Sequence, residues 1–312
     1  MIRNQKQVFL LGPTASGKTA VAKKLYDYFP LEIISVDSSQ IYKELDVGSA
    51  KLSQEELKKY PHHLINIKNP SERYSVNEFK LDVDKASKKI YQAGRVPLFV
   101  GGTMMYFNSL EHPLNEMPAS TDEVRKEVQH DLDKFGLTYL YNELTKLDPV
   151  IVKKIGPTDT QRILRAIEVY RISGKPLSYY HQAKIHPEDN YELLKIALLP
   201  KDKNNLHKRI EARTNEMIKN GLIDEVRLLL KNNPSLDLSF PSLRSVGYKQ
   251  VYEFIQGKIS LADLNEKITI ATRQLAKRQM TWIRSMKNLV LIDPFEEELD
   301  QLIKNCVKNF LN

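Results

Sequence analysis

A run of residues near the N-terminus has the types and spacing of a phosphate-binding loop. It fits the pattern G-x-x-x-x-G-K-[ST] and reads Gly12-Pro13-Thr14-Ala15-Ser16-Gly17-Lys18-Thr19. The glycines allow the backbone to curl, so that several N–H groups converge on one anion. Lys18 would bring a full positive charge to the phosphates, and the hydroxyl of Thr19 can bind Mg²⁺. The segment therefore predicts a di- or triphosphate site, without saying whether a phosphoryl group is transferred.

Asp37 is the acidic side chain that we expect beside this loop, because it follows the apolar run 31–36 directly. Parallel sheets place ligands at the carboxyl ends of their strands, where this carboxylate can bind Mg²⁺ or act as a base. A structural role as a helix N-cap is the alternative. The apolar run 96–100 ends instead in Gly101-Gly102-Thr103 and offers no carboxylate. Thr103 can approach a substrate closely after two glycines, or it can cap a helix.

The phosphate loop, Asp37 and Thr103 can meet only if a sheet brings them to one edge. The first hundred residues alternate between apolar runs and helical patterns. Continuously apolar strands that alternate with helices predict a parallel sheet covered on both faces. We therefore expect an α/β fold with a core like that of P-loop NTPases. The expected strands are 8–11, 31–36, 96–100 and 193–199, and the expected helices are 19–29 and 75–93.

From about residue 118 the pattern changes to one helix after another, at 122–134, 137–146 and 159–174. We interpret 118–180 as a helical insertion domain. The α/β core then consists of 1–117 and 181–312, with basic helices toward the C-terminus.

Composition narrows the possible functions. The chain has 312 residues, enough for about two domains of ordinary size. Lys and Arg outnumber Asp and Glu by 47 to 39, which permits a polyanionic partner but equally suits a basic metabolic enzyme. Cys306 is the only cysteine, so we expect no internal disulfide and a cytoplasmic location. We expect neither a membrane span nor a secretory signal, because no apolar run is long enough.

The string Asp37-Ser38-Ser39-Gln40-Ile41-Tyr42, with the phosphate loop before it and Gly101-Gly102-Thr103 after it, closely resembles the tRNA dimethylallyltransferases, also called tRNA isopentenyltransferases. The bacterial type is the closer match, since the chain lacks the C-terminal zinc finger of larger eukaryotic members. The resemblance continues in order through segments 46–51, 161–166, 172–175, 209–213, 245–249 and 272–279.

The resemblance implies transfer of a dimethylallyl group from dimethylallyl diphosphate to the N6 amine of an adenosine. This adenosine lies 3′ of the anticodon in tRNAs that read codons beginning with U. The loop would then bind the diphosphate of the donor with Mg²⁺, and a monomer is expected. Asp37 matches the family's general base. Arg213 matches an arginine that completes the diphosphate clamp, although composition alone would place it on a solvated helix face.

Several polar side chains are candidates for binding tRNA. The clearest signal from the residues themselves is the stretch 267–292, which has six basic residues and no acidic one. We expect Arg273, Lys277 and Arg284 on one helical face, opposite an apolar stripe of Leu275, Ala276, Trp282, Ile283 and Met286. By the resemblance or by charge, the remaining candidates are Asp37, Ser38, Ser39, Gln40, Thr103, Arg125, Gln161, Arg162, Arg165, Arg244, Lys249 and Arg278.

Two other functions fit parts of the chain. A P-loop small-molecule kinase, with Asp37 as base for an acceptor hydroxyl, accounts for the first hundred residues but not for the basic helix or the insertion. A non-enzymatic RNA-binding protein accounts for the basic helix but leaves Lys18, Thr19 and Asp37 without a role.

Overall fold

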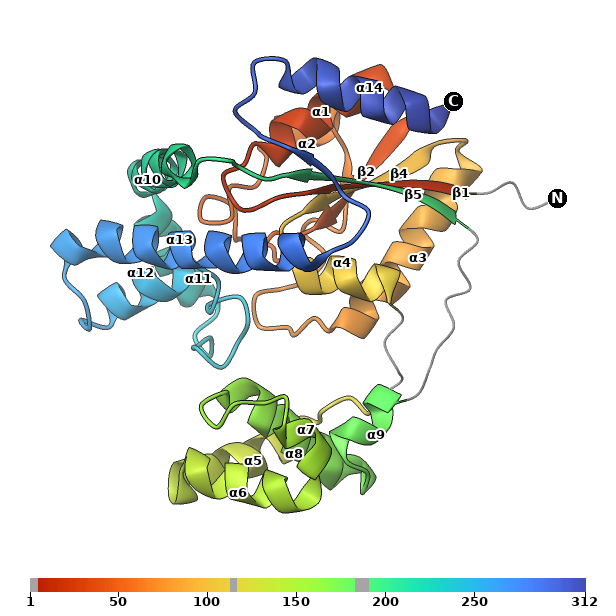
Figure 1. Ribbon diagram of the computed structural model, residues 1–312. Helices are drawn as coiled ribbons and strands as arrows, with labels where there is room; N and C mark the ends of the chain where they lie inside the picture. Colours follow the sequence, from red (N-terminus) through yellow and green to blue (C-terminus); the bar gives the residue numbers. More distant parts are fainter. Residues whose placement is uncertain (1–4, 113–116, 183–190) are drawn as a thin grey trace. The chain divides into compact units, whose positions relative to one another are not determined.

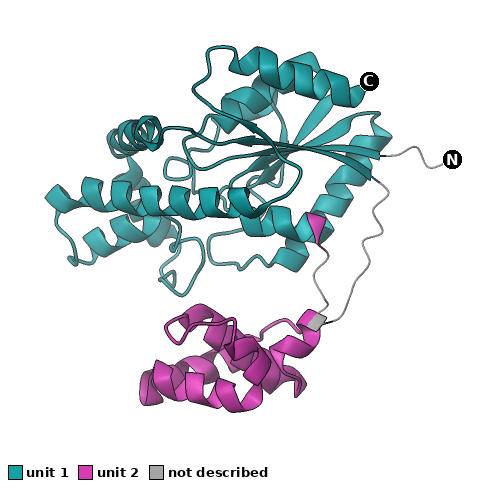
Figure 2. Cartoon of the chain, in the orientation of Figure 1, with its two compact units in different colours: residues 1–110, 189–312 teal, residues 111–188 magenta. Residues whose placement is uncertain are grey.

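The computed structural model describes residues 5–112, 117–182 and 191–312 (Figure 1). The chain divides into two compact units (Figure 2). Unit 1 comprises Met1–Leu110 and Asp189–Asn312, and unit 2 comprises Glu111–Glu188. The predicted insertion 118–180 falls inside the bounds of unit 2.

Unit 1 is built on a parallel sheet in the order β3-β2-β4-β1-β5-β6. Its central strand β1 pairs with β4 on one side and with β5 on the other. This architecture confirms the predicted α/β class. The strands are β1 (Gln5–Leu11), β2 (Leu31–Val36), β3 (His62–His63), β4 (Val96–Gly101), β5 (Tyr191–Leu198) and β6 (Val290–Ile292).

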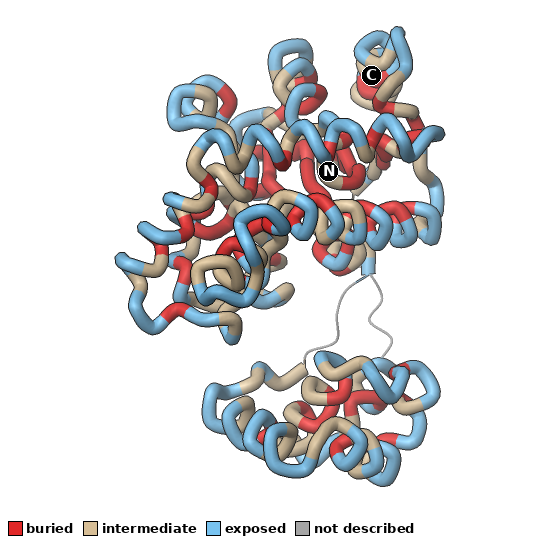
Figure 3. The backbone as a smooth tube through the Cα atoms, turned by 90° about the vertical axis from the view of Figure 1, so that its left-hand side faces the viewer, coloured by how far each residue is buried: buried red, intermediate tan, exposed pale blue. Residues whose placement is uncertain are grey.

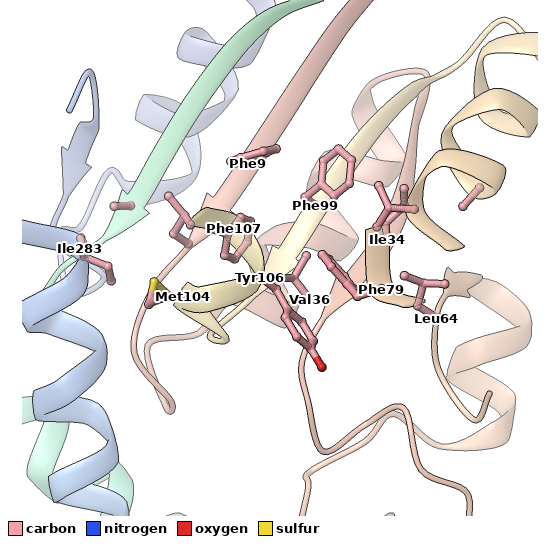
Figure 4. Packing of buried hydrophobic residues seen from close by; sticks show 14 of the residues in the cluster. Phe9, Ile34, Val36, Leu64, Phe79, Phe99, Met104, Tyr106, Phe107 and Ile283 are labelled. Atoms are coloured by element: carbon pink, nitrogen blue, oxygen red, sulfur yellow. The ribbon is translucent and has the colours of Figure 1, made fainter. Parts of the chain in front are cut away.

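Side chains alternate along each strand, so the sheet presents one apolar layer to each face. On one face, Phe9 and Phe99 pack with residues of α3 and α4 and with Ile283 of α13 (Figure 4). On the other face, Val8 and Leu10 pack against α1 and α14. The helices concerned are α1 (Lys18–Tyr28), α3 (Val76–Gln92), α4 (Met104–Glu111), α13 (Leu261–Ser285) and α14 (Leu299–Leu311).

Three more helices of unit 1 form two smaller clusters with α13. One cluster joins α10 to α13 through Leu206, Ile210, Ala276 and Met280. The other packs α11, α12 and the start of α13 against the segment that follows β2. These helices are α10 (Lys203–Lys219), α11 (Leu222–Asn232) and α12 (Tyr248–Ile255). Helix α2 (Gln54–Lys59) buries no residue, and its Glu56 pairs with Lys23 of α1 at 3.0 Å.

Unit 2 is helical, and its buried residues gather between the helices (Figure 3). Local signals fix the helix ends: Thr121 and Asp159 accept hydrogen bonds from the first turns of α5 and α8, and Gly174 adopts the left-handed conformation after α8. The helices are α5 (Asp122–Phe135), α6 (Leu137–Leu147), α7 (Pro149–Val152), α8 (Thr160–Ser173) and α9 (Leu177–Gln182).

The basic stretch 267–292 is only partly helical. Helix α13 begins earlier, at Leu261, and ends at Ser285, while 290–292 form strand β6. Trp282 does not belong to the apolar stripe, because it is 41% exposed, and Met286 lies just past the helix end. Gln279, Met280 and Ile283 are buried instead. No helix in the described part of the chain is long and apolar enough to span a membrane.

Candidate functional site

The strands β1, β2 and β4 bring their carboxyl ends to one edge of the sheet, as the order predicts. The phosphate loop follows β1, Asp37 follows β2, and Gly102 with Thr103 follows β4. A pocket lies at this edge within unit 1. It is lined by Lys18, Thr19, Ser35, Asp37, Gln40, Ala50, Leu52, His62, Ile65, Val100 and Gly101.

The phosphate loop has the backbone that its glycines predict. Gly17 has a φ of 88° and precedes the first residue of α1, so the loop opens onto a helix N-terminus. Ala15 also has a positive φ, of 63°. Lys18 Nζ donates hydrogen bonds to the carbonyl oxygens of Gly12, at 2.9 Å, and Pro13, at 2.7 Å. The side chain of Lys18 therefore folds back onto the backbone of its own loop.

The lysine ammonium is desolvated in this position. Burial lowers the pKa of Lys18 to about 7, and the positive charge of Arg213 adds to the effect. The carboxylate of Asp37 acts in the opposite direction. An anion placed in the loop would favour the charged form of Lys18.

Ser16 has a buried hydroxyl in the same loop. It is 1% exposed, and its Oγ has no hydrogen-bond partner among the residues that the structure describes. An unpaired buried hydroxyl is costly, so a ligand atom that pairs with it would recover that cost. This observation agrees with a polar ligand at the loop.

Asp37 holds the turn that follows β2. Its Oδ1 accepts hydrogen bonds from the N–H groups of Ser39, at 2.8 Å, and Gln40, at 3.2 Å. Oδ2 makes no hydrogen bond within the described ranges. The carboxylate also attracts the charges of Lys18 and Arg213 electrostatically. One oxygen therefore fixes the side chain, and the other stays available for chemistry.

Arg213 is drawn into the site rather than solvated, contrary to the expectation from composition. It is partly buried on α10, and its Nη1 lies 3.4 Å from Oγ1 of Thr14 in the phosphate loop. Desolvation lowers the pKa of its guanidinium, and Asp37 opposes this shift. Helix α10 thus places a second cation at the loop.

Thr103 and the polar turn after Asp37 are tied together. Thr103 Oγ1 accepts a hydrogen bond from the N–H of Ser38 at 3.0 Å, so its side chain links the segment after β4 to the turn after β2. Gln40 Nε2 donates to the carbonyl of Ser49 at 3.2 Å. Ser39 Oγ lies 3.0 Å from Oγ of Ser245.

Glu225 organises the loop at 46–51, a role that residue types and spacing alone did not reveal. Its carboxylate accepts hydrogen bonds from the N–H groups of Asp46, Val47 and Gly48, at 2.7–3.1 Å. It also accepts one from the hydroxyl of Tyr248 at 2.6 Å. The contact crosses about 180 positions of sequence, and no local pattern signals it.

The basic candidates in unit 1 differ in their surroundings. Lys277, Arg278 and Arg284 are exposed on α13, as is Arg244 before α12. Arg273 instead pairs with Glu211 at 3.3 Å, and Lys249 lies 3.7 Å from Glu253. Free positive charge on α13 therefore lies mainly at 277–284.

The candidates in unit 2 gather on α5 and α8. Gln161 and Arg162 are exposed, and Arg162 lies 3.4 Å from Asp159. Arg165 is half-buried and donates to Ser120 and to the carbonyl oxygen of Pro118, which leaves it engaged inside the unit. Arg125 pairs with Asp122 at 3.0 Å.

Comparison with known proteins places the chain among prenyl-transferring enzymes. A family model described as IPP transferase matches residues 40–286, and one described as isopentenyl transferase matches residues 6–69. A tRNA dimethylallyltransferase of Nitrosomonas eutropha is 43% identical over 95% of this chain and 93% of its own length. The tRNA dimethylallyltransferase of Methylobacillus flagellatus is 41% identical, over 100% of this chain and 99% of its own length.

Solved structures similar to this chain are enzymes of the same kind. The full-length tRNA isopentenylpyrophosphate transferase of Bacillus halodurans is 31% identical with a TM-score of 0.68, and the match covers 99% of this chain and 98% of the other. A eukaryotic dimethylallyltransferase, described as acting on tRNA, is 25% identical with a TM-score of 0.80, over 99% of this chain and 80% of the other.

Proposed function

The chain belongs to the IPP transferase family, and we propose that it transfers a dimethylallyl group from dimethylallyl diphosphate to tRNA. The acceptor is the N6 amine of the adenosine 3′ of the anticodon, in tRNAs that read codons beginning with U. The chain is a prenyltransferase, and its products are N6-isopentenyladenosine in tRNA and diphosphate. The observation that carries the proposal is the pocket that Lys18, Thr19 and Asp37 line together.

The chemistry follows from these side chains. The N6 nitrogen attacks C1 of the dimethylallyl group as the bond from C1 to the diphosphate oxygen breaks. Asp37 accepts the N6 proton through its available Oδ2, and help of this kind is worth about 10²–10⁴-fold. The charge that develops on the departing diphosphate is stabilised by Lys18, Arg213 and the N–H groups of the loop.

Mg²⁺ fits the donor set as a partner of the diphosphate. The hydroxyl of Thr19 supplies an oxygen ligand of the kind that Mg²⁺ prefers, while Oδ2 of Asp37 is reserved for the N6 proton. Among the residues that the structure describes, no group of three or more His, Cys, Asp or Glu forms a dedicated metal site. The ion would therefore take its other ligands from the diphosphate and water. When bound, it neutralises part of the charge of the leaving group.

We further propose that tRNA binds through exposed basic groups, with Lys277, Arg278 and Arg284 of α13 as the main phosphate contacts in unit 1. Gln161 and Arg162 of α8 are the accessible candidates in unit 2. The target adenine must leave the anticodon-loop stack to reach Asp37, at a cost of a few kcal/mol. A protein that acts on tRNA is expected to work in the cytoplasm.

Incubation with donor labelled in its prenyl group, or with ATP labelled at the γ-phosphate, tests this function. We expect the prenyl label to appear in unmodified tRNA, and not in a tRNA with guanosine at the target position. ATP should not be consumed. Transfer of the γ-phosphate to a small alcohol would instead establish the kinase alternative.

A further inference from the structure

Gln279 lies between two loops of the site, although it does not line the pocket. It is 9% exposed on α13, and its Oε1 accepts a hydrogen bond from the N–H of Thr14 at 2.8 Å. Its Nε2 donates to the carbonyl oxygen of Gly102, also at 2.8 Å. An N–H group can only donate and a carbonyl can only accept, so these two partners fix the orientation of the amide.

The contact with the β4 loop depends on a glycine. A Cβ atom added to Gly102 would lie only 2.5 Å from Nε2 of Gln279. The absence of a side chain therefore lets the amide reach the backbone. Gln279 joins the loop after β1 to the loop after the neighbouring strand β4, and β4 also pairs with β2, the strand that Asp37 follows.

The phosphate loop also packs on the helix pair that carries Gln279. Ala15 lies against the cluster in which Leu206 and Ile210 of α10 meet Ala276 and Met280 of α13. The N–H of Thr14 donates a hydrogen bond to Gln279, and the hydroxyl of Thr14 accepts one from Arg213. The position of the loop is therefore linked to the position of α13.

The same helix presents Lys277 and Arg278 to solvent, directly before Gln279. We infer that Gln279 is a positioning residue that couples RNA binding on this basic face of α13 to the geometry of the phosphate loop. The inference rests on the proposed function, which makes tRNA the polyanion that binds α13. A helix moves largely as a unit, so a shift or stiffening of α13 reaches Thr14 through the amide. Because coupling between two sites is reciprocal, each ligand should tighten the other.

The test is the dissociation constant of inorganic diphosphate, measured by calorimetry with and without saturating unmodified tRNA at fixed ionic strength. We expect tRNA to tighten diphosphate binding at least about fivefold in the natural protein. Gln279→Met keeps the length of the side chain but loses both hydrogen bonds, so the ratio should fall to near one. Its affinity for tRNA alone should change less than about twofold, because the basic side chains remain.

Gln274→Met makes the same chemical change at an exposed position of α13 and should keep the natural ratio. Gln279→Glu retains an acceptor for Thr14 but has no donor for Gly102, so tRNA should tighten its diphosphate binding by an intermediate factor. If Gln279→Met does not fold, Gln279→Glu provides the test in its place. A ratio of one in the natural protein, or an unchanged ratio in both Gln279 variants, overturns the inference. Prenyl transfer by the natural protein is measured separately, so a failure of the proposed function is distinguishable from a failure of the coupling.

Discussion

The ammonium of Lys18 should make donor binding depend on pH in a range where most lysines stay charged. Burial lowers its pKa to about 7, far below the usual value for a lysine. A bound diphosphate adds negative charge beside the group and raises the pKa again. Binding should therefore take up a proton whenever the free protein holds Lys18 neutral.

The size of the effect follows from the pKa. At pH 8 only about a tenth of Lys18 is charged in the free protein, so binding should take up about 0.9 proton at this residue. At pH 6 the uptake should fall to about 0.1 proton. As far as Lys18 determines it, the affinity for inorganic diphosphate is then nearly full at pH 6. It weakens about tenfold per pH unit above 7, until the pH reaches the pKa of the bound state.

Calorimetry at pH 8 in two buffers of different ionisation enthalpy measures the protons taken up. Lys18→Arg is the control, because a guanidinium stays charged throughout this range. The protons that the arginine variant still takes up belong to the diphosphate itself and are subtracted. Equal proton uptake by the natural protein and Lys18→Arg would refute the reasoning.

Three further perturbations probe the rest of the site. Asp37→Asn keeps the oxygen that holds the turn but removes the base, so the rate of single-turnover transfer should fall at least about a hundredfold, with tRNA affinity nearly intact. A near-normal rate would show that Asp37 is not the base. The double variant Lys277→Ala, Arg278→Ala should bind tRNA more weakly, and the slope of log binding constant against log salt concentration should become shallower by roughly 0.7–0.9 per lost phosphate contact. An unchanged slope would mean that these side chains do not contact the RNA. Glu225→Ala leaves three N–H groups and the Tyr248 hydroxyl without their acceptor, so urea denaturation should show a loss of about 3 kcal/mol. Asp224→Ala on the same helix should cost little, because its ion pair with Arg227 is exposed.

The sheet and the phosphate loop were predictable because their signals are local. Apolar runs that end in Gly12, Asp37 and Gly101 mark both the strands and the edge at which the loops meet. Strands β3 and β6 have two and three residues, which is too short for any periodicity to appear. The sequence therefore predicted the edge at which the loops after β1, β2 and β4 meet, but not every strand of the sheet.

Long-range contacts explain what residue types and spacing alone missed, including Arg213, which only the resemblance singled out. Arg213 and Gln279 reach the loop from positions 199 and 265 residues away. The charge pattern of α10 is that of a solvated helix, and only the packing of α10 on α13 turns Arg213 toward Thr14. Trp282 shows the reverse error, because a large aromatic residue in a helix was expected to be buried and is exposed.

The dependence of residue 14 on residue 279 has a consequence for synthesis on the ribosome. Strand β1 leaves the ribosome early with β4, but its other edge stays bare until β5 at 191–198 has emerged. The helices of unit 2 make local contacts and emerge before β5, so they can fold while the sheet is still open. Arg213 and then Gln279 arrive later still. The oldest part of the nascent chain, the phosphate loop, is therefore among the last parts of the molecule to acquire its working shape.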